Sequence, residues 1–445
     1  MPVFVVNGCT HGDLDQIYDA ILEAEDTRHV QTDFFLSCGD FQAIRTREEL
    51  DTLACPDKYR HMKDFTKYWS GESKPSCPTI FIGGNHEAPG HLRELYYGGY
   101  ASENIYYLGH SGVLNISGVR IAGLSGIFKG GDFETGHFET FPYTEDTKRS
   151  AYHVKRFEVE KLLLIKEPID VFISHDWPGG ITDYGDVEKL LKIDKTGQLT
   201  ADIKNKTLGN PFSMALIKKL KPKYWFSGHM HMHFTAIYVH DDGSLTRFMA
   251  LDKCQPGRQF LHFFELDNKS KELVGEVVHE GGTRTNGRVC LDIEWLSILK
   301  LNNGSIPLEK YASHVALVQP SRDDLQAVIK LLREDGQARE IEVGKFEAPF
   351  FGRSRPGEKR YREWLCRALQ MDDVLAKYEY SLGPQEPLKT VLDDEGLFYI
   401  DDFSGGAIGE TETVRAEPSV STEHDTSHPP GAKRPRVDEE IDLDL

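Results

Sequence analysis

Short apolar runs separated by helical patterns are the feature of this sequence that most constrains its fold. The runs are too short for helices and rich in Val, Ile and Phe, as expected for buried strands. They are Val3–Val6, Asp33–Ser37, Thr79–Ile82, Val119–Leu124, Asp170–Ser174 and Tyr224–Phe226. Helical spacing occurs between them, at Leu14–Glu25, Lys58–Tyr68 and Val154–Ile165. This alternation predicts a layered α/β fold in which helices flank a sheet.

A change of pattern near residue 235 predicts a second sheet. The runs Thr235–His240 and Leu245–Leu251 flank Asp241-Asp242-Gly243-Ser244, which favours a hairpin turn. A third strand-like run, Phe260–Leu266, follows. We expect these three strands to form a second sheet packed on the first, which makes residues 1–268 a two-sheet sandwich.

The rest of the chain is expected to hold a smaller C-terminal domain and a disordered acidic tail. Helical patterns lie at Val289–Leu301, Asp323–Glu334 and Tyr361–Tyr378, within a domain predicted at 269–402. The segment 403–445 is rich in Gly, Ser, Thr, Glu and Pro and has few large apolar residues. It cannot bury enough surface to offset its ordering entropy, so we predict that it is disordered.

Charge is distributed unevenly along the 445 residues, whose formal net charge is −19. This acidity argues against indiscriminate nucleic-acid binding. The stretch from Lys345 to Arg367 nevertheless has seven bases against three acids. Because distant charges are screened, such a stretch can bind phosphates in an acidic protein. Considered alone, it is better interpreted as a solvated helix or loop face.

Three features bear on the cellular compartment. The seven cysteines are scattered without a CxxC pair, which suits free thiols in a reducing compartment. No apolar run is long enough to cross a bilayer, and Pro2–Val6 is better interpreted as a first strand than as a signal peptide. The tail cluster Ala432-Lys433-Arg434-Pro435-Arg436 is either an address for a nuclear import receptor or an incidental group of charges. The first interpretation predicts a nuclear protein that can shuttle to the cytoplasm.

Polar motifs directly follow five of the apolar runs. They are Gly8-Cys9-Thr10-His11-Gly12, Gly39-Asp40, Gly84-Asn85-His86-Glu87, Ser174-His175-Asp176 and Gly228-His229-Met230-His231. The carboxyl ends of neighbouring strands in an α/β sheet meet at one crevice. We therefore expect these motifs to lie together although they are far apart in the sequence.

The side chains in these motifs are of the kinds that bind transition metals. They are four imidazoles, two oxygen donors and one thiol: His11, His175, His229, His231, Asp40, Asn85 and Cys9. This mixture suits Zn²⁺, Fe²⁺ or Mn²⁺ better than Mg²⁺ or Ca²⁺, which prefer oxygen ligands alone. Two of the histidines, 229 and 231, point the same way on an extended strand end because they are two residues apart.

The motifs differ in specificity when each is considered alone. A lone Gly-Asp is nearly uninformative, and His175 by itself is more often a hydrogen-bonded core histidine than a ligand. Gly228-His229-Met230-His231 is moderately specific, and Gly84-Asn85-His86-Glu87 after a strand is more so. Chance is a poor explanation for all five in this order, at roughly one in twenty or less.

This order of motifs resembles the calcineurin-like metallophosphoesterase superfamily over residues 1 to about 235. The resemblance implies a metallophosphoesterase sandwich with two adjacent metal sites that share one carboxylate. One site would use Cys9, His11, Asp40 and His231, and the other Asp40, Asn85, His175 and His229. The resemblance also implies that His86 contacts the reacting phosphate and is not a ligand.

Cys9 departs from the superfamily pattern, in which most members have Asp at this position. A thiolate is a soft donor, so it favours Zn²⁺ or Fe²⁺ over Mn²⁺ at the first site. This difference puts equal occupancy of the two sites in question. The alternative is that Cys9 is a small buried residue that binds nothing and leaves a weak first site.

Further motifs are similar to the lariat debranching enzyme family. They are the Cys9 motif, Ser174-His175-Asp176-Trp177-Pro178, Leu251-Asp252-Lys253-Cys254 and an insertion at 127–156 that is rich in glycine and aromatic residues. In that family the insertion recognises branched RNA. The similarity reaches to about residue 400 and marks 269–402 as the C-terminal domain of that family. It implies a hydrolase that cleaves the 2′–5′ bond at the branch point of excised intron lariats.

The composition of the insertion also suits RNA when the family is set aside. Aromatic side chains can stack on splayed bases, and basic side chains can contact phosphates. The candidate RNA contacts are Lys129, Phe133, Phe138, Phe141, Tyr143, Lys148 and Arg149. The alternative is a loop folded on its own aromatic cluster, and the two interpretations can hold for different residues.

The expected chemistry is in-line hydrolysis, with His86 as the acid that protonates the departing 2′-oxygen. One rival function is another metallophosphoesterase activity, such as a DNA nuclease or a phosphomonoesterase, which shares every ligand but gives no reason for the insertion. A second rival is a non-catalytic interaction scaffold on the same fold. Such scaffolds typically lose ligands or the motif histidine, and this chain keeps them. The oligomeric state is not predicted.

Overall fold

The computed structural model describes residues 2–194, 197–267, 287–352, 355–376, 390–392 and 398–400. Contacts divide the chain into two units, Met1–Tyr380 and Ser381–Leu445. In the second unit the described residues form a hairpin of β16 (Thr390–Leu392) and β17 (Phe398–Ile400). The predicted tail at 403–445, with its basic cluster at 432–436, lies outside the described residues.

The first sheet has six strands in the order β12-β1-β2-β3-β5-β4. They are β1 (Val3–Asn7), β2 (Phe34–Ser37), β3 (Thr79–Phe81), β4 (Gly99–Ser102), β5 (Ile105–Tyr107) and β12 (Leu261–Glu265). The four inner strands are parallel, and the two edge strands run antiparallel to them. Strands β1, β2 and β3 are buried along their whole length, which explains their continuous apolar sequences.

The second sheet has nine strands in the order β10-β11-β9-β8-β7-β6-β13-β15-β14. They are β6 (Ser111–Ile116), β7 (Val119–Leu124), β8 (Val171–Ser174), β9 (Tyr224–Ser227), β10 (Phe234–Val239), β11 (Leu245–Ala250), β13 (Val289–Leu291), β14 (Arg339–Glu342) and β15 (Lys345–Glu347). Strands β11, β9, β8 and β7 are parallel neighbours. Their carboxyl ends therefore lie along one edge of the sheet.

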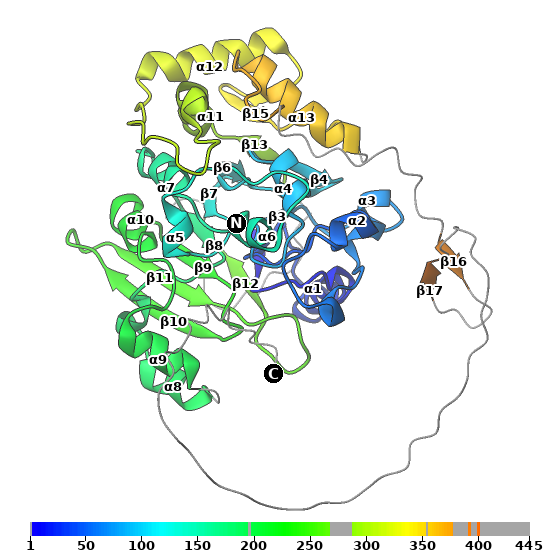
Figure 1. Ribbon diagram of the computed structural model, residues 1–445, viewed down its shortest axis with the longest axis vertical. Coiled ribbons are helices and arrows are strands. Elements are labelled where there is room, and N and C mark those ends of the chain that lie inside the picture. Colours follow the sequence, from blue (N-terminus) through cyan, green and yellow to red (C-terminus); the bar gives the residue numbers. More distant parts are fainter. Residues whose placement is uncertain are drawn as a thin grey trace, which may run out of the picture. The chain divides into compact units, whose positions relative to one another are not determined.

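Helices flank the two sheets, as Figure 1 shows. They are α1 (Leu14–Arg28), α2 (Arg47–Leu50), α3 (Phe65–Ser70), α4 (Pro89–Glu94), α5 (Gly130–Phe133), α6 (Glu145–Ser150), α7 (Arg156–Leu163), α8 (Val187–Ile193), α9 (Gln198–Asn205), α10 (Ser213–Leu220), α11 (Ile293–Asn302), α12 (Arg322–Asp335) and α13 (Arg355–Ala368). Short 3₁₀ turns are η1 (Asp57–Tyr59), η2 (Ile181–Tyr184) and η3 (Asn303–Ser305). Among the described residues, no helix has the length and apolar character needed to span a membrane.

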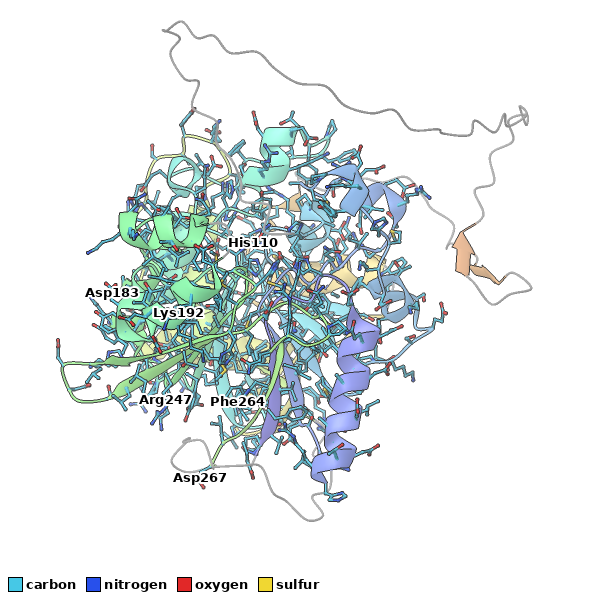
Figure 2. All side chains as sticks on the ribbon, turned by 90° about the horizontal axis from the view of Figure 1, so that it is seen from below. His110, Asp183, Lys192, Arg247, Phe264 and Asp267 are labelled. Carbon is cyan, nitrogen blue, oxygen red and sulfur yellow. The ribbon has the colours of Figure 1, made fainter. Side chains whose placement is uncertain are left out.

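The core lies between the two sheets and beneath the helices. Phe4 of β1 meets Phe226 of β9 across the sandwich, with ring centroids 6.3 Å apart. On the other face of β1, Val3 and Val5 pack against α1, which lies beside these strands in Figure 2. Burial of such side chains contributes about 25 cal/mol per Å² of apolar surface. This packing on both faces holds the strand ends in fixed positions.

The predicted α/β sandwich of two sheets is confirmed. The six apolar runs form β1, β2, β3, β7, β8 and β9, and the predicted hairpin is β10–β11. Helices α1, α7 and α12 lie at predicted positions. All seven cysteines are free and buried. Strands β4, β5 and β6 were not predicted.

Two predictions in the first domain were wrong. The run Phe260–Leu266 forms β12 and joins the first sheet, because the Gly8 N–H and the Asn7 side chain both donate to the Phe260 carbonyl at its start, 3.2 and 3.0 Å away. The helix predicted at Lys58–Tyr68 is split into η1 and α3. Between these two elements, the chain is tied to the first motif by an Asp64 N–H bond to the Gly12 carbonyl.

Two helix boundaries in the C-terminal region also differ from prediction. The segment predicted as helix from Val289 begins as β13, and α11 starts only after Asp292, whose side chain accepts the Trp295 N–H as a cap. Helix α13 ends at Ala368, and Gln370 has a φ of 54°. Strands β13, β15 and β14 extend the second sheet beyond β6. The domain boundaries at 268 and 402 stay predictions.

Candidate metal centre

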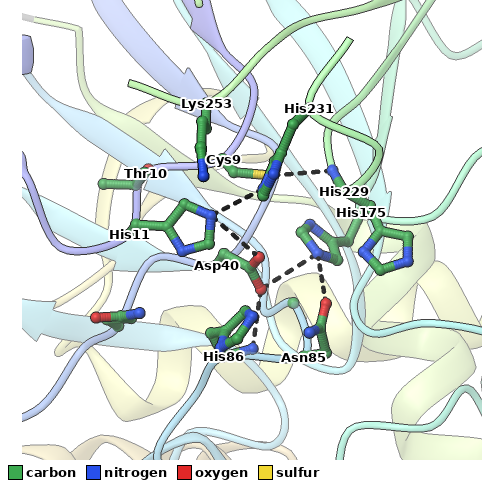
Figure 3. A network of polar contacts seen from close by, with 12 residues as sticks. Cys9, Thr10, His11, Asp40, Asn85, His86, His175, His229, His231 and Lys253 are labelled. Atoms are coloured by element: carbon green, nitrogen blue, oxygen red, sulfur yellow. Dashed lines mark hydrogen bonds and ion pairs between the residues drawn. The ribbon is translucent and has the colours of Figure 1, made fainter. Parts of the chain in front are cut away.

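Five strand ends meet at one place in the molecule. Strands β1, β2 and β3 of the first sheet and β8 and β9 of the second all end there. The polar residues that follow them are Cys9, His11, Asp40, Asn85, His86, His175, His229 and His231, which Figure 3 shows as one network. The convergence expected from the sequence is therefore present, with each motif at the carboxyl end of its strand.

Four of these side chains converge on one point. One donor atom each from Cys9, His11, Asp40 and His231 lies within 4.8 Å of the other three. The Nε2 atoms of His11 and His231 are 2.9 Å apart, and the Nε2 of His11 is 3.7 Å from a carboxylate oxygen of Asp40. The buried Nδ1 of His231 has no hydrogen-bond partner among the described residues.

A second group adjoins the first through Asp40. The Nε2 of His175 lies 3.2 Å from Asp40 Oδ1 and 3.2 Å from Asn85 Oδ1. The Nδ1 of His175 donates to the carbonyl of Cys38 at 2.7 Å, which leaves Nε2 with its lone pair facing the group. The His229 ring lies 5.0 Å from the His175 ring. The structure thus brings together both predicted ligand sets, with Asp40 between them.

Four of the candidate ligands have a strained backbone conformation. His11, Asp40, His229 and His231 have φ values of 48°, 47°, 66° and 48°. Residues other than glycine rarely adopt this left-handed conformation. Each residue that does so costs about 1–3 kcal/mol of stability. Such residues cluster where function requires a particular side-chain direction, and here they are four of the seven candidate ligands.

The lack of a side chain at Gly84 allows the strand ends of the two sheets to come so close. A Cβ atom at this position would lie 2.1 Å from Asp40 Oδ1 and 2.6 Å from His175 Nε2. Neither atom can move away without breaking the group. Only glycine fits here, which gives a physical reason for the glycine that precedes Asn85.

The charge states of Asp40, His229 and His231 suit a cation. Burial opposes ionisation of Asp40, but His175 and His86 hold its pKa well below the usual value. Burial lowers the pKa of His229 to about 3 and that of His231 well below its usual value, so both rings are neutral near pH 7. Neutral imidazoles and a carboxylate are the forms that bind metals. These residues therefore fit a divalent cation.

Cys9 is fully buried next to this group, and burial and Asp40 raise the pKa of its thiol. Its sulfur accepts the backbone N–H of His229 at 2.9 Å. Without a neighbouring cation, Cys9 is therefore a neutral thiol. A bound cation would be needed to stabilise the thiolate. Its position fits the predicted ligand role, which stays a prediction.

Glu87 fixes the two loops that carry Asp40 and Asn85 relative to each other. Its carboxylate accepts the N–H groups of Phe41 at 2.6 Å, Gln42 at 3.0 Å and Gly84 at 3.1 Å. It thereby joins the loop after β2 to the loop after β3. Burial raises the pKa of Glu87 to about 7. The sequence contained it as the last residue of a motif, but its role was not predicted.

His86 lies at the rim of the group. Its backbone N–H donates to Asp40 Oδ1 at 2.9 Å, and its half-buried ring is 5.3 Å from the His11 ring between centroids. This position is beside both ligand sets and open to solvent, which suits contact with a bound substrate.

Comparison with known proteins identifies the family. The profile described as calcineurin-like phosphoesterase matches residues 2–233, more than half of the chain. The profile described as the C-terminal domain of the lariat debranching enzyme matches residues 243–348. A protein of Arabidopsis thaliana named lariat debranching enzyme is 45% identical over 330 residues, which are 74% of this chain and 75% of that protein. This chain belongs to the lariat debranching enzyme family.

Vertebrate members of the lariat debranching enzyme family match a similar part of the chain. Proteins with that name from Danio rerio and Homo sapiens are each 46% identical, over 300 and 307 residues. The matches cover 66% and 68% of this chain, and 50% and 54% of those proteins. The matched part of this chain thus spans about half the length of these two relatives.

The insertion predicted at 127–156 starts beside the metal centre. The Phe128 N–H donates to the carboxylate of Asp176, next to a candidate ligand, at 3.0 Å. The Gly126 N–H donates to the Gly83 carbonyl at 2.8 Å. The base of the insertion is therefore fixed to the loops after β8 and β3.

The predicted RNA contacts of the insertion differ in accessibility. Exposed members are Lys129, Phe141 and Arg149, and half-buried members are Phe138, Tyr143 and Lys148. Phe133 is buried and stacks on Phe212 with centroids 3.9 Å apart, so it is not open to RNA in this structure. The predicted RNA contact of Phe133 stays a prediction, and its stacking on Phe212 joins the insertion to the residue that precedes α10.

Among the described side chains of the stretch from Lys345 to Arg367, several bases are paired with acids. Arg362 is buried and bonds Asp373 at 3.1 Å, and Lys359 lies 3.7 Å from Glu363. These pairs fit the interpretation of a structural and solvated face. No phosphate-binding role for this stretch is supported by them.

Proposed function

We propose that this member of the lariat debranching enzyme family hydrolyses the 2′–5′ phosphodiester bond at the branch point of excised intron lariats. The product is linear RNA, which can then be turned over. The observation that carries this proposal is the convergence of seven candidate ligands from five strand ends, next to the base of the insertion. The family name of the relatives supplies the substrate class.

Two divalent cations would be held by the two ligand sets. The first set is Cys9, His11, Asp40 and His231, and the second is Asp40, Asn85, His175 and His229. When bound, such cations make water nucleophilic at neutral pH and neutralise charge on the phosphate. We propose Fe²⁺, Zn²⁺ or Mn²⁺ as the metals, and the thiol of Cys9 favours Zn²⁺ or Fe²⁺ at the first site.

His86 is proposed as the acid for the leaving group. The branch-point 2′-oxygen leaves with excess negative charge and needs a proton, and histidine is the side chain that most often supplies one as a general acid. The backbone bond from His86 to Asp40 fixes the residue relative to both ligand sets. Its half-buried ring remains open to an entering phosphate.

The insertion is proposed to hold the RNA around the branch. The exposed side chains of Lys129 and Arg149 suit phosphates, and exposed Phe141 suits an unstacked base. Half-buried Phe138, Tyr143 and Lys148 offer part of their surface for the same purpose. A branch presents two arms at once, so a loop beside the centre can select it over linear RNA.

The proposed function is tested by comparing three substrates at equal enzyme and metal concentration. These are a synthetic branched RNA, linear single-stranded DNA and 4-nitrophenyl phosphate. We expect cleavage of the branched RNA at the 2′–5′ bond, with the 3′–5′ bonds intact. Preference for DNA or for the monoester would favour the corresponding rival activity. No cleavage of any substrate by metal-loaded protein would favour a scaffold.

A nuclear location is also proposed, with shuttling to the cytoplasm. It rests on the basic cluster 432–436, which lies outside the described residues, and on the nuclear origin of intron lariats. Fluorescence microscopy of the full chain, with Lys433, Arg434 and Arg436 changed to Ala as the variant, is the test. Loss of nuclear fluorescence supports an import address, and unchanged distribution shows an incidental cluster.

A further inference from the structure

We infer that Lys253 binds a phosphate of the branched RNA at the metal centre, on the flank opposite the insertion. This inference deepens the proposed function and rests on it for the identity of the substrate. The sequence motif that contains Lys253 carried the family resemblance, but no role for this side chain followed from it.

Sheet topology places Lys253 beside the ligands. Strands β11, β9, β8 and β7 are parallel neighbours, so all four end at the same edge of the second sheet. The two inner strands, β9 and β8, lead to the candidate ligands of this sheet. The insertion follows β7 on one flank, and Leu251–Lys253 follows β11 on the other. A substrate over the ligands therefore has the insertion on one side and Lys253 on the other.

Backbone contacts hold Lys253 directly against the first motif. Its backbone forms a parallel β-bridge with Cys9, and the Cys254 N–H donates to the Cys9 carbonyl at 3.1 Å. A Cβ atom at Gly8 would lie 2.3 Å from the Asp252 carbonyl oxygen, so only glycine permits this approach. The position of Lys253 is thus set by the same residues that set Cys9.

The Lys253 side chain points at the ligand group. Figure 3 shows it entering from the side of Cys9 and His231. The side chain is half-buried, so its ammonium can reach both the group and an entering anion. Lysine is a compact point charge with three donors, which suits a single phosphate oxygen.

Contacts made by the backbone and by Asp252 hold the loop around Lys253. The Asp252 carboxylate accepts the Lys253 backbone N–H at 2.7 Å and pairs with Arg258 at 2.9 Å. The Asp252 N–H donates to the Gln259 carbonyl at 3.1 Å. A change confined to the end of the Lys253 side chain should therefore leave the loop and Cys9 in place.

The test compares Lys253→Met and Lys253→Arg with the wild type. Met keeps the length of the apolar stem and removes the charge, whereas Arg keeps the charge. Lys219→Met is the matched control, because it removes an exposed lysine near the end of α10, which leads into the start of β9 and not its carboxyl end. Metal content is measured for every variant before kinetics.

We expect kcat/KM on branched RNA to fall roughly 10- to 100-fold in Lys253→Met, as for loss of one charged hydrogen bond, with metal content unchanged. Lys253→Arg should recover part of this loss, and Lys219→Met should match the wild type. Reduced metal content in Lys253→Met would overturn the inference, because the lysine would then act on the ligands. An unchanged kcat/KM would also overturn it.

Binding gives a second readout that does not depend on turnover. Affinity of chelator-treated protein for the same branched RNA is measured from 50 to 300 mM salt. Each phosphate contact of a lysine steepens the dependence of affinity on salt by somewhat less than one logarithmic unit. We expect Lys253→Met to lower this slope by about that amount, and Lys219→Met to leave it unchanged. Equal slopes would contradict a phosphate contact.

A failure of the proposed function can be distinguished from a failure of the Lys253 inference. Wild-type protein that cleaves bis(4-nitrophenyl) phosphate but not branched RNA would count against the RNA substrate. The Lys253 inference is then decided on the diester, where a higher KM in Lys253→Met supports a phosphate contact and an unchanged KM overturns it.

Discussion

Histidines and a carboxylate in left-handed backbone conformations distinguish the metal centre at the scale of single residues. His11, Asp40, His229 and His231 all have positive φ. A chain accepts this cost only where surrounding packing enforces it. Glu87 supplies part of that enforcement by binding three backbone N–H groups of the two ligand loops. Each side chain therefore has a direction that its neighbours impose.

His86→Ala should lower kcat on branched RNA by about 10²- to 10⁴-fold, the usual contribution of a general acid. Metal content should not change, since the ring is not among the candidate ligands and its backbone bond to Asp40 survives. His61→Ala, at an exposed histidine, is the control. Near-normal turnover by His86→Ala would remove this residue from the mechanism.

Cys9→Asp should shift the metal preference toward Mn²⁺, because it replaces a soft donor by a hard one. The ratio of activity with Mn²⁺ to activity with Zn²⁺ after reconstitution is the measurement, and it should rise several-fold. A ratio equal to that of the wild type would mean that Cys9 is a buried residue outside the ligand set.

At the scale of elements, the insertion rests on a buried ionic network. Glu158 of α7 accepts from His137 of the insertion at 3.0 Å and pairs with Lys161 at 2.8 Å. Lys155 pairs with Glu139 at 3.0 Å, also within the insertion. Removing one partner from such a buried network leaves an uncompensated charge, which lowers the free energy of unfolding by about 3–5 kcal/mol. The network gives the insertion a fixed base beside the metal centre.

Glu158→Gln should destabilise the protein at pH 7 by several kcal/mol and by less in acid. Burial opposes ionisation of Glu158, but Lys161 and His137 hold its pKa well below its usual value. A carboxylate with a lowered pKa stabilises the fold above its unfolded pKa of about 4.3, and this contribution is lost as pH falls through the folded pKa.

Urea unfolding of wild type and Glu158→Gln at pH 7 and pH 3.5 is the measurement. The difference in free energy of unfolding should be smaller at pH 3.5 by about 1 kcal/mol, from the integrated proton linkage. Glu188→Gln, at an exposed position on α8, should show no such change. An equal difference at both pH values would contradict the lowered pKa.

The sequence allowed the strand ends and their motifs to be predicted because fully buried strands are short apolar runs with polar residues directly after them. It did not reveal which sheet β12 joins, since both faces of that run carry apolar residues and its antiparallel pairing with β1 links segments distant in the sequence. Strand β4, Gly-Tyr-Ala-Ser, has no strand-like pattern. The nearness of Lys253 to Cys9 was not predicted, because it depends on pairing between segments distant in sequence.

At the scale of the whole molecule, the metal centre joins the two sheets. Ligands come from β1, β2 and β3 on one side and from β8 and β9 on the other, so a bound cation would link both halves of the sandwich. Free energy of binding to the folded state adds to the free energy of unfolding. Removal of metal should therefore affect global stability as well as activity.

Chelation should lower the melting temperature of the wild type by several degrees. Metal at about 100 times its dissociation constant stabilises by about 2.7 kcal/mol, and about 1 kcal/mol corresponds to a few degrees in a protein of more than 150 residues. Differential scanning calorimetry with and without chelator measures the shift. Asp40→Asn should show little or no shift, and a shift equal to that of the wild type would place the metal elsewhere.

Metal stoichiometry of ligand variants tests most directly whether distant strand ends form one centre with two adjoining sites. Wild type, His231→Ala and His175→Ala are purified under reducing, oxygen-free conditions, reconstituted and analysed by elemental mass spectrometry. The wild type should hold about two ions per chain, as in two-metal hydrolases, and each variant about one, with branched-RNA cleavage lost in both. Unchanged metal content in the two variants, or full cleavage without the lost ion, would contradict the shared centre.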